Sequence, residues 1–150
     1  MQILDNNKIN QVSVNTEFFP FFHIENVFSS CLEPTSLTDN FPKIDRGGSF
    51  PTEKLSDGIL KDLIKELEGN EFRSLLEHKF KIDLTDSEVV TTLRGYSRSK
   101  DGKIHTDSKS KIITVLLYLN IDWNNHEGNL RLLKENNNLD SIIKEISSEF

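Results

Sequence analysis

The strongest constraint on how this chain folds is the apolar run from Ile112 to Leu119, within "KIITVLLYLN". β-Branched residues open the run, and the polar residues Lys111 and Asn120 bound it, which favours a buried β-strand. As a helix, the run would be too short to cross a bilayer. A strand this apolar must pair with other strands and face a core, so it predicts a sheet in this part of the chain.

Hydrophobic periodicity divides the chain into two regions. In residues 1–88, apolar side chains recur at helical spacing from Ser56 to Leu67, and a second helix is predicted over Glu71 to Phe80. Residues 89–150 show short apolar stretches separated by polar turns, which is typical of strands. We expect one domain, 1–150, in which an N-terminal extended and helical region supports a mainly β barrel or sandwich.

Composition narrows the function classes. The chain has 150 residues, of which 28% are charged and 35% hydrophobic, as in an ordinary soluble domain. Its net charge of −6, with scattered basic residues, argues against nucleic acid or an anionic membrane as the main partner. Residues after Met1 do not resemble a signal sequence, so a cytoplasmic location is expected. Cys31 is the one cysteine, so no internal disulfide forms.

A His-x-Asp motif, His105-Thr106-Asp107, stands just before the apolar run. If the segment is extended, residues i and i+2 point to the same side, so imidazole and carboxylate can reach one metal ion. With a second imidazole, they would make the facial triad that binds non-haem Fe(II) and leaves coordination positions open. The alternative is a turn in which Asp107 caps its own backbone.

The residues around the motif narrow this choice. Residues 94–133 resemble the Fe(II)- and 2-oxoglutarate-dependent dioxygenases, in particular the prolyl-hydroxylase-like branch, including bacterial members without an assigned substrate. In that family, the His-x-Asp precedes a strand ending in Tyr-Leu-Asn, then a Trp, then Gly-Gly-x-Leu-Arg-Leu. Here the same order is met by Tyr118-Leu119-Asn120, Trp123 and Gly128-Asn129-Leu130-Arg131-Leu132.

The resemblance implies a double-stranded β-helix, or jelly-roll, whose inner face holds the iron. It implies that His105 and Asp107 are the catalytic metal ligands and that Tyr118 binds a carboxylate of 2-oxoglutarate. By strand alternation, Thr114 and Leu116 would share the face of Tyr118.

The resemblance also implies a reaction. Tyr96 would be a second tyrosine of the cosubstrate pocket, with a plain core tyrosine as the alternative. Fe(II) and 2-oxoglutarate are then the expected cofactor and cosubstrate, and ascorbate is allowed as a further cofactor. The expected activity is an oxidoreductase: hydroxylation of a C–H bond in an amino acid, a peptide or another small molecule, with release of succinate and CO2.

Two departures from the family pattern bear on this expectation. Asn129 replaces the usual second Gly, although Asn tolerates positive φ well. The family's third ligand is a His followed by Arg or Lys well downstream, and the sequence stops at Phe150 first, so the jelly-roll is expected to be incomplete. Neither His126, in a turn, nor the N-terminal His23 and His78 fits that place. We therefore do not expect residues 1–150 alone to be enzymatically active.

The alternative function is a non-catalytic β-helix binding module or an inactive fragment. The sequence leaves the substrate, the role of Arg131 and the oligomeric state open, although an unclosed sheet would allow pairing into a homodimer.

Overall fold

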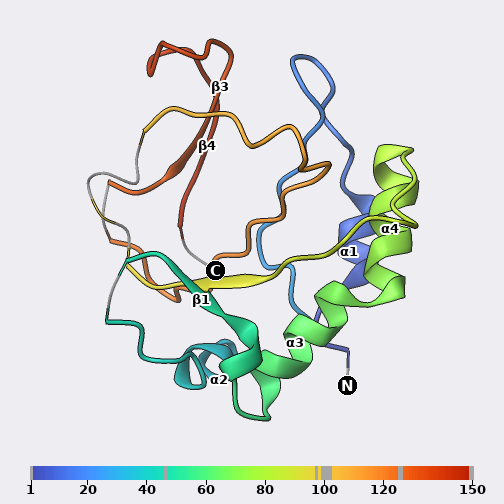
Figure 1. The fold of residues 1–150 in the computed structure, drawn as a ribbon, viewed down its shortest axis with the longest axis vertical. Helices are drawn as coiled ribbons and strands as arrows, with labels where there is room; N and C mark the ends of the chain where they lie inside the picture. The colour runs from blue at the N-terminus through green and yellow to red at the C-terminus, as the bar shows by residue number, and fades with distance from the viewer. Residues whose placement is uncertain (1, 46, 97, 99–102, 125–126, 149–150) are drawn as a thin grey trace. The chain divides into compact units, whose positions relative to one another are not determined.

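The computed structural model describes residues 2–45, 47–96, 98, 103–124 and 127–148, and it divides into two compact units (Figure 1). The first unit is Met1–Gly95 and the second is Tyr96–Phe150. Each unit is described by itself below. The turn predicted at Asp101-Gly102 and the side chain of His126 lie outside the described residues. The subdivision at residue 88 stays a prediction.

The described part of the first unit contains four α-helices. They are α1 (Asn6–Gln11), α2 (Pro34–Asp39), α3 (Ile59–Glu68) and α4 (Asn70–Phe80), and a 3-10 helix, η1, spans Thr52–Lys54. The two helices predicted from periodicity are thus confirmed as α3 and α4. α3 buries Leu60, Leu63 and Ile64, because residues spaced three and four apart share one face of a helix.

The core of the first unit forms where the N-terminal segment, α2 and α3 bring aliphatic side chains together. Its most buried members, each at most 2% exposed, are Ile3, Leu4, Ile9, Leu37 and Leu63. α4 contacts both α3 and α1, so the helices pack on one another.

Glu66 on α3 ties the N-terminal segment to this core. Its two carboxylate oxygens accept hydrogen bonds from the backbone N–H groups of Ile3, at 2.8 Å, and Leu4, at 3.0 Å. The side chains of both partners are buried, so these N–H groups have little access to water. The carboxylate therefore satisfies two donors that would otherwise be costly to bury.

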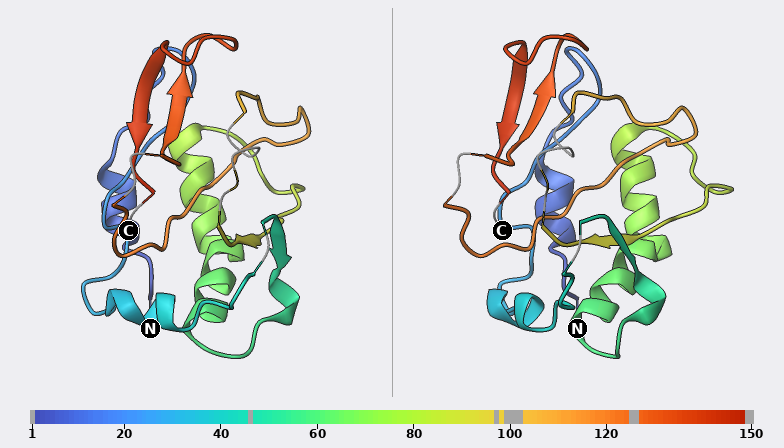
Figure 2. Two further views of the ribbon diagram at one scale, coloured as in Figure 1. Left: turned by 90° about the vertical axis from the view of Figure 1, so that its left-hand side faces the viewer. Right: turned by 60° about the vertical axis from the view of Figure 1, so that its left-hand side comes forward.

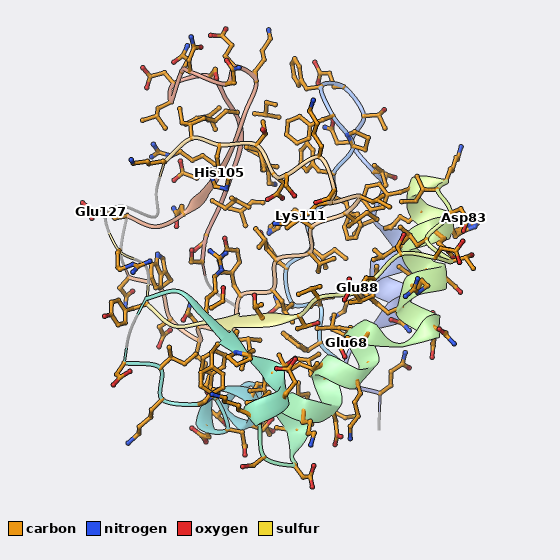
Figure 3. The ribbon with its side chains drawn as sticks, in the orientation of Figure 1. Glu68, Asp83, Glu88, His105, Lys111 and Glu127 are labelled. Atoms are coloured by element: carbon orange, nitrogen blue, oxygen red, sulfur yellow. The ribbon has the colours of Figure 1, made fainter. Side chains whose placement is uncertain are left out.

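Replacing Glu66 by Gln is expected to lower the free energy of unfolding by about 2 kcal/mol, because an amide N–H would face a backbone donor. The measurement is urea unfolding followed by circular dichroism of the helices. The matched control is Glu68→Gln on the exposed side of the same helix (Figure 3), which removes the same charge and should change stability by less than about 0.5 kcal/mol. Equal effects of the two variants would contradict the role of Glu66.

A short antiparallel sheet completes the first unit. β1 (Ser49–Pro51) pairs with β2 (Thr92–Arg94), with Phe50 opposite Leu93. The β-prone stretch predicted from Val89 therefore forms a strand only at residues 92–94.

The described residues of the second unit form one hairpin. β3 (Leu130–Leu133) and β4 (Ile142–Ile146) pair antiparallel and lie side by side in both views of Figure 2. The register shifts between Leu132 and Leu133, as at a β-bulge. After β4, buried Ser148 donates from its hydroxyl to the carbonyl of Gly128, at 2.8 Å, which fastens the end of the hairpin to its start.

The predicted jelly-roll is wrong. In the residues that the structure describes, the sheets are the two-stranded pairs β1-β2 and β3-β4, with 25% helix and 14% strand, so the fold is a small mixed α/β one and not mainly β. Residues 103–119, expected to supply two strands, form neither helix nor strand. The physical reason is that strand-forming residues specify a preference for pairing but not the partner that must supply the hydrogen bonds.

No helix in the described ranges is both long enough and apolar enough to cross a membrane.

Candidate functional site

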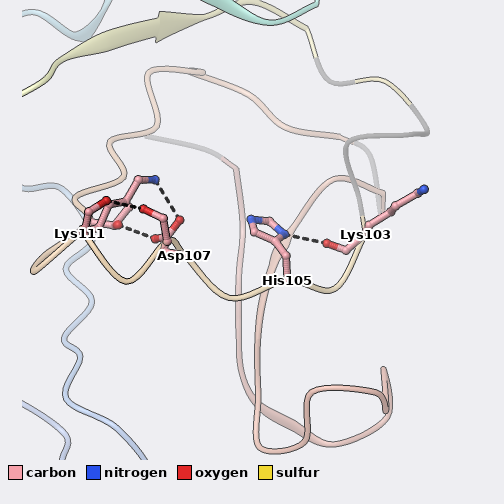
Figure 4. A network of polar contacts seen from close by, with 7 residues as sticks. Lys103, His105, Asp107 and Lys111 are labelled. Atoms are coloured by element: carbon pink, nitrogen blue, oxygen red, sulfur yellow. Dashed lines mark hydrogen bonds and ion pairs between the residues drawn. The ribbon is translucent and has the colours of Figure 1, made fainter.

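The His-x-Asp motif lies in the second unit, on a segment between Lys103 and a turn at residues 108–111 (Figure 4). Figure 4 shows the side chains of His105 and Asp107 on the same side of this segment, as their spacing predicts. Both residues are exposed. Each makes its polar contacts within its own stretch of chain, so the motif is held by local structure.

His105 is oriented by a single backbone group. Its Nδ1 lies 2.8 Å from the carbonyl oxygen of Lys103. A carbonyl oxygen only accepts hydrogen bonds, so Nδ1 must carry the proton and donate it. In the neutral imidazole, Nε2 then keeps its lone pair, which is the arrangement seen in many histidine metal ligands.

Asp107 is held as a carboxylate. Its Oδ1 lies 2.9 Å from Nζ of Lys111, and its Oδ2 accepts a hydrogen bond from the hydroxyl of Thr114. The hydrogen bond from Thr114, followed by that from Lys111, holds the pKa of Asp107 below its ordinary value, against a small opposing effect of burial. Asp107 is therefore ionised at neutral pH and available as an anionic ligand.

The turn after the motif explains how Lys111 reaches Asp107. The N–H of Lys111 donates to the carbonyl of Ser108, at 3.0 Å, and the hydroxyls of Ser108 and Ser110 lie 2.8 Å apart. This turn brings residue 111 back toward residue 107. Lys111 was not predicted as part of the site; an acidic and a basic residue four apart across "DSKSK" was the available signal.

The predicted cosubstrate residues differ in exposure and in contacts. Thr114 contacts Asp107, whereas Leu116 is 55% exposed and Tyr96 is 57% exposed. Tyr118 is half-buried, and burial raises the pKa of its phenol, while a hydrogen bond with the side chain of Ser148 acts in the opposite direction. The alternative of a plain core tyrosine at position 96 does not fit this exposure.

Arg131 lies on the exposed side of the hairpin. Its Nε donates to Oε2 of Glu145 on the facing strand, at 2.8 Å. Asn129 donates to the other oxygen of Glu145, at 2.9 Å, and these two hydrogen bonds, that of Asn129 first, lower the pKa of Glu145. In this structure Arg131 therefore makes a cross-strand ion pair.

The turn before β3 is built around Gly128. Gly128 has φ +89°, and a Cβ atom there would lie 2.9 Å from the ring of Trp123. The indole Nε1 of Trp123 donates to the carbonyl of Glu127, at 3.1 Å. The residue with positive φ is thus Gly128 and not Asn129. Asn129, in the place of the family's second Gly, therefore does not disturb the turn.

The donors present fit part of an Fe(II) site. An imidazole whose Nδ1 contacts a backbone carbonyl and an ionised carboxylate on one side of a segment are the right ligand types. Within the described ranges, no group of three or more His, Cys, Asp or Glu side chains is placed to hold a metal ion. His105 and Asp107 would therefore supply two ligands of such a site.

Comparison with protein-family models, with curated proteins and with solved structures finds no match for this chain.

Proposed function

We propose that His105 and Asp107 are iron ligands of a 2-oxoglutarate-dependent oxygenase that hydroxylates a C–H bond. One observation carries the proposal: the two side chains lie on the same side of their segment, with Nδ1 of His105 against the Lys103 carbonyl and Asp107 ionised. The likeness of residues 94–133 to the dioxygenases supports it. The proposal does not require the jelly-roll that the structure contradicts, because ligand chemistry belongs to the site.

Each residue of the motif has a defined task. Bound Fe(II) would supply open coordination positions for 2-oxoglutarate and oxygen. The hydrogen bond from Nδ1 of His105 to Lys103 fixes the ring so that Nε2 can bind the ion. Asp107 provides the negative charge, and its carboxylate has lone pairs left beyond those that Lys111 and Thr114 use.

Tyr118 is the proposed partner of the 2-oxoglutarate carboxylate. Its phenol is half-buried and stays protonated at neutral pH, because burial raises its pKa. A neutral phenol can donate a hydrogen bond to a carboxylate, at the expense of its present contact with Ser148. The substrate class, an amino acid, a peptide or another small molecule, follows from the family likeness alone.

The test is an assay for succinate in protein purified from its natural source, supplied with Fe(II), oxygen and 2-oxoglutarate. Succinate should form only when all three are present, and a chelator should stop it. Absence of succinate from metal-loaded, folded protein would favour the non-catalytic binding module. Omitting each component in turn is the matched control.

A further inference from the structure

Lys111 places a positive charge directly against the carboxylate of Asp107. Its Nζ lies 2.9 Å from Oδ1 of Asp107. In Figure 4 the ammonium group lies on the side of the segment to which the side chains of His105 and Asp107 point. A cation of the chain itself therefore stands on the face to which the two proposed iron ligands project.

Local structure holds this lysine in place. The backbone N–H of Lys111 donates to the carbonyl of Ser108, at 3.0 Å, and this turn carries residue 111 back toward residue 107. The ion pair is open to solvent, since the side chain of Lys111 is 52% exposed and that of Asp107 is 42% exposed. Ion pairs this exposed add little to the stability of a fold. The main effect of Lys111 is therefore on the charge around Asp107.

The two hydrogen-bond donors to the carboxylate differ in charge. Thr114 donates to Oδ2 from a neutral hydroxyl, whereas Lys111 brings a full positive charge to Oδ1. A divalent ion that binds Asp107 must share the carboxylate with this ammonium group or displace it. Two cations on one carboxylate, a dication and an ammonium about 5 Å apart in water, repel each other enough to lower affinity about tenfold. Dissolved salt reduces this repulsion.

We propose that Lys111 is a competing cation that weakens the binding of divalent metal ions at His105 and Asp107. This inference rests on the proposed iron site, and it adds a residue that sets the affinity of the site without being a ligand. It predicts that metal binding tightens when the charge of Lys111 is removed. If Lys111 instead served to position Asp107 for the ion, the same change would weaken binding.

The experiment titrates Mn(II) into the full protein, purified from its natural source and treated with a chelator, and follows the electron paramagnetic resonance signal of the free ion. Lys111→Gln should lower the dissociation constant by about fivefold to tenfold at low salt. Lys111→Arg keeps the charge and should bind as wild type does. Lys109→Gln makes the same charge change at an exposed lysine outside the ion pair, and it should alter the constant by less than about twofold.

Variants of Asp107 separate this inference from the iron site on which it rests. Asp107→Ala should weaken Mn(II) binding, and adding Lys111→Gln to it should have little further effect, because the competition acts through the carboxylate. If Asp107→Ala binds Mn(II) as wild type does, or if no variant binds it, both proposals are overturned. If Asp107→Ala weakens binding but Lys111→Gln does not tighten it beyond Lys109→Gln, only the role of Lys111 is overturned.

Discussion

Replacing Asp107 by Ala is expected to abolish Fe(II)-dependent succinate formation, with a loss of more than about 100-fold. Losing a metal ligand lowers activity more than losing a residue that only orients a ligand. The substitution removes the anionic ligand and leaves the imidazole of His105 as the one proposed ligand. The measurement is succinate release at saturating 2-oxoglutarate, in protein carrying the variant and purified from its natural source. His105→Ala should give a loss of the same order.

Two measurements separate this chemical effect from misfolding. Asp140→Ala removes an exposed carboxylate from the turn between β3 and β4, and it should leave succinate formation unchanged. The Asp107 variant should also bind Mn(II), used as an oxygen-stable probe, more weakly than wild type, while its far-ultraviolet circular dichroism is unaltered. Retained turnover in the Asp107 variant would rule out its assignment as a ligand.

The helices were predictable because their signal is local. The positions of Leu60, Leu63 and Ile64 fix one face of α3 through a period of 3.6 residues, and Gly69 marks its end. These features depend on residues within a few turns of one another, so a single sequence contains them. What the sequence did not show is what the buried faces contact: α4, α2 and the N-terminal segment that Glu66 holds.

The strand predictions were wrong for the opposite reason, because strand pairing is not a local property. The segment "KIITVLLYLN" has strong strand-forming residues, yet no ladder forms along residues 112–119, whereas the less apolar "LRLL" of β3 pairs with β4. A strand needs a partner whose position is set by the rest of the fold. Propensity therefore located an apolar segment correctly but could not assign it a neighbour.

In the candidate site, too, local features could be predicted from the sequence and non-local contacts could not. The placement of His105 and Asp107 on one side of their segment follows from alternation over three residues, and Figure 4 shows it. The approach of Lys111 depends on a turn, and the contact of Tyr118 with Ser148 joins residues far apart in sequence. Alternation alone could not predict either contact, so Tyr118 was assigned to the cosubstrate without its present partner being known.

Leu63→Ala is expected to lower the free energy of unfolding by about 3 kcal/mol, because it removes most of a fully buried side chain and leaves a cavity. Leu63 is 1% exposed and lies on the face of α3 that forms the core of the first unit. Leu37 and Ile3, which belong to other elements, are equally buried, and a closely packed core does not readily move into a cavity.

The measurement is urea unfolding followed by circular dichroism, since the helices of the described chain all belong to the first unit. Trp123 lies in the second unit, so its fluorescence is not the appropriate probe. Leu67→Ala on the same helix makes the same change at a half-buried position and should cost only about 1 kcal/mol, as less apolar surface is lost. If the two variants were equally stable, α3 would not present Leu63 to the core, and the packing derived for this unit would be wrong.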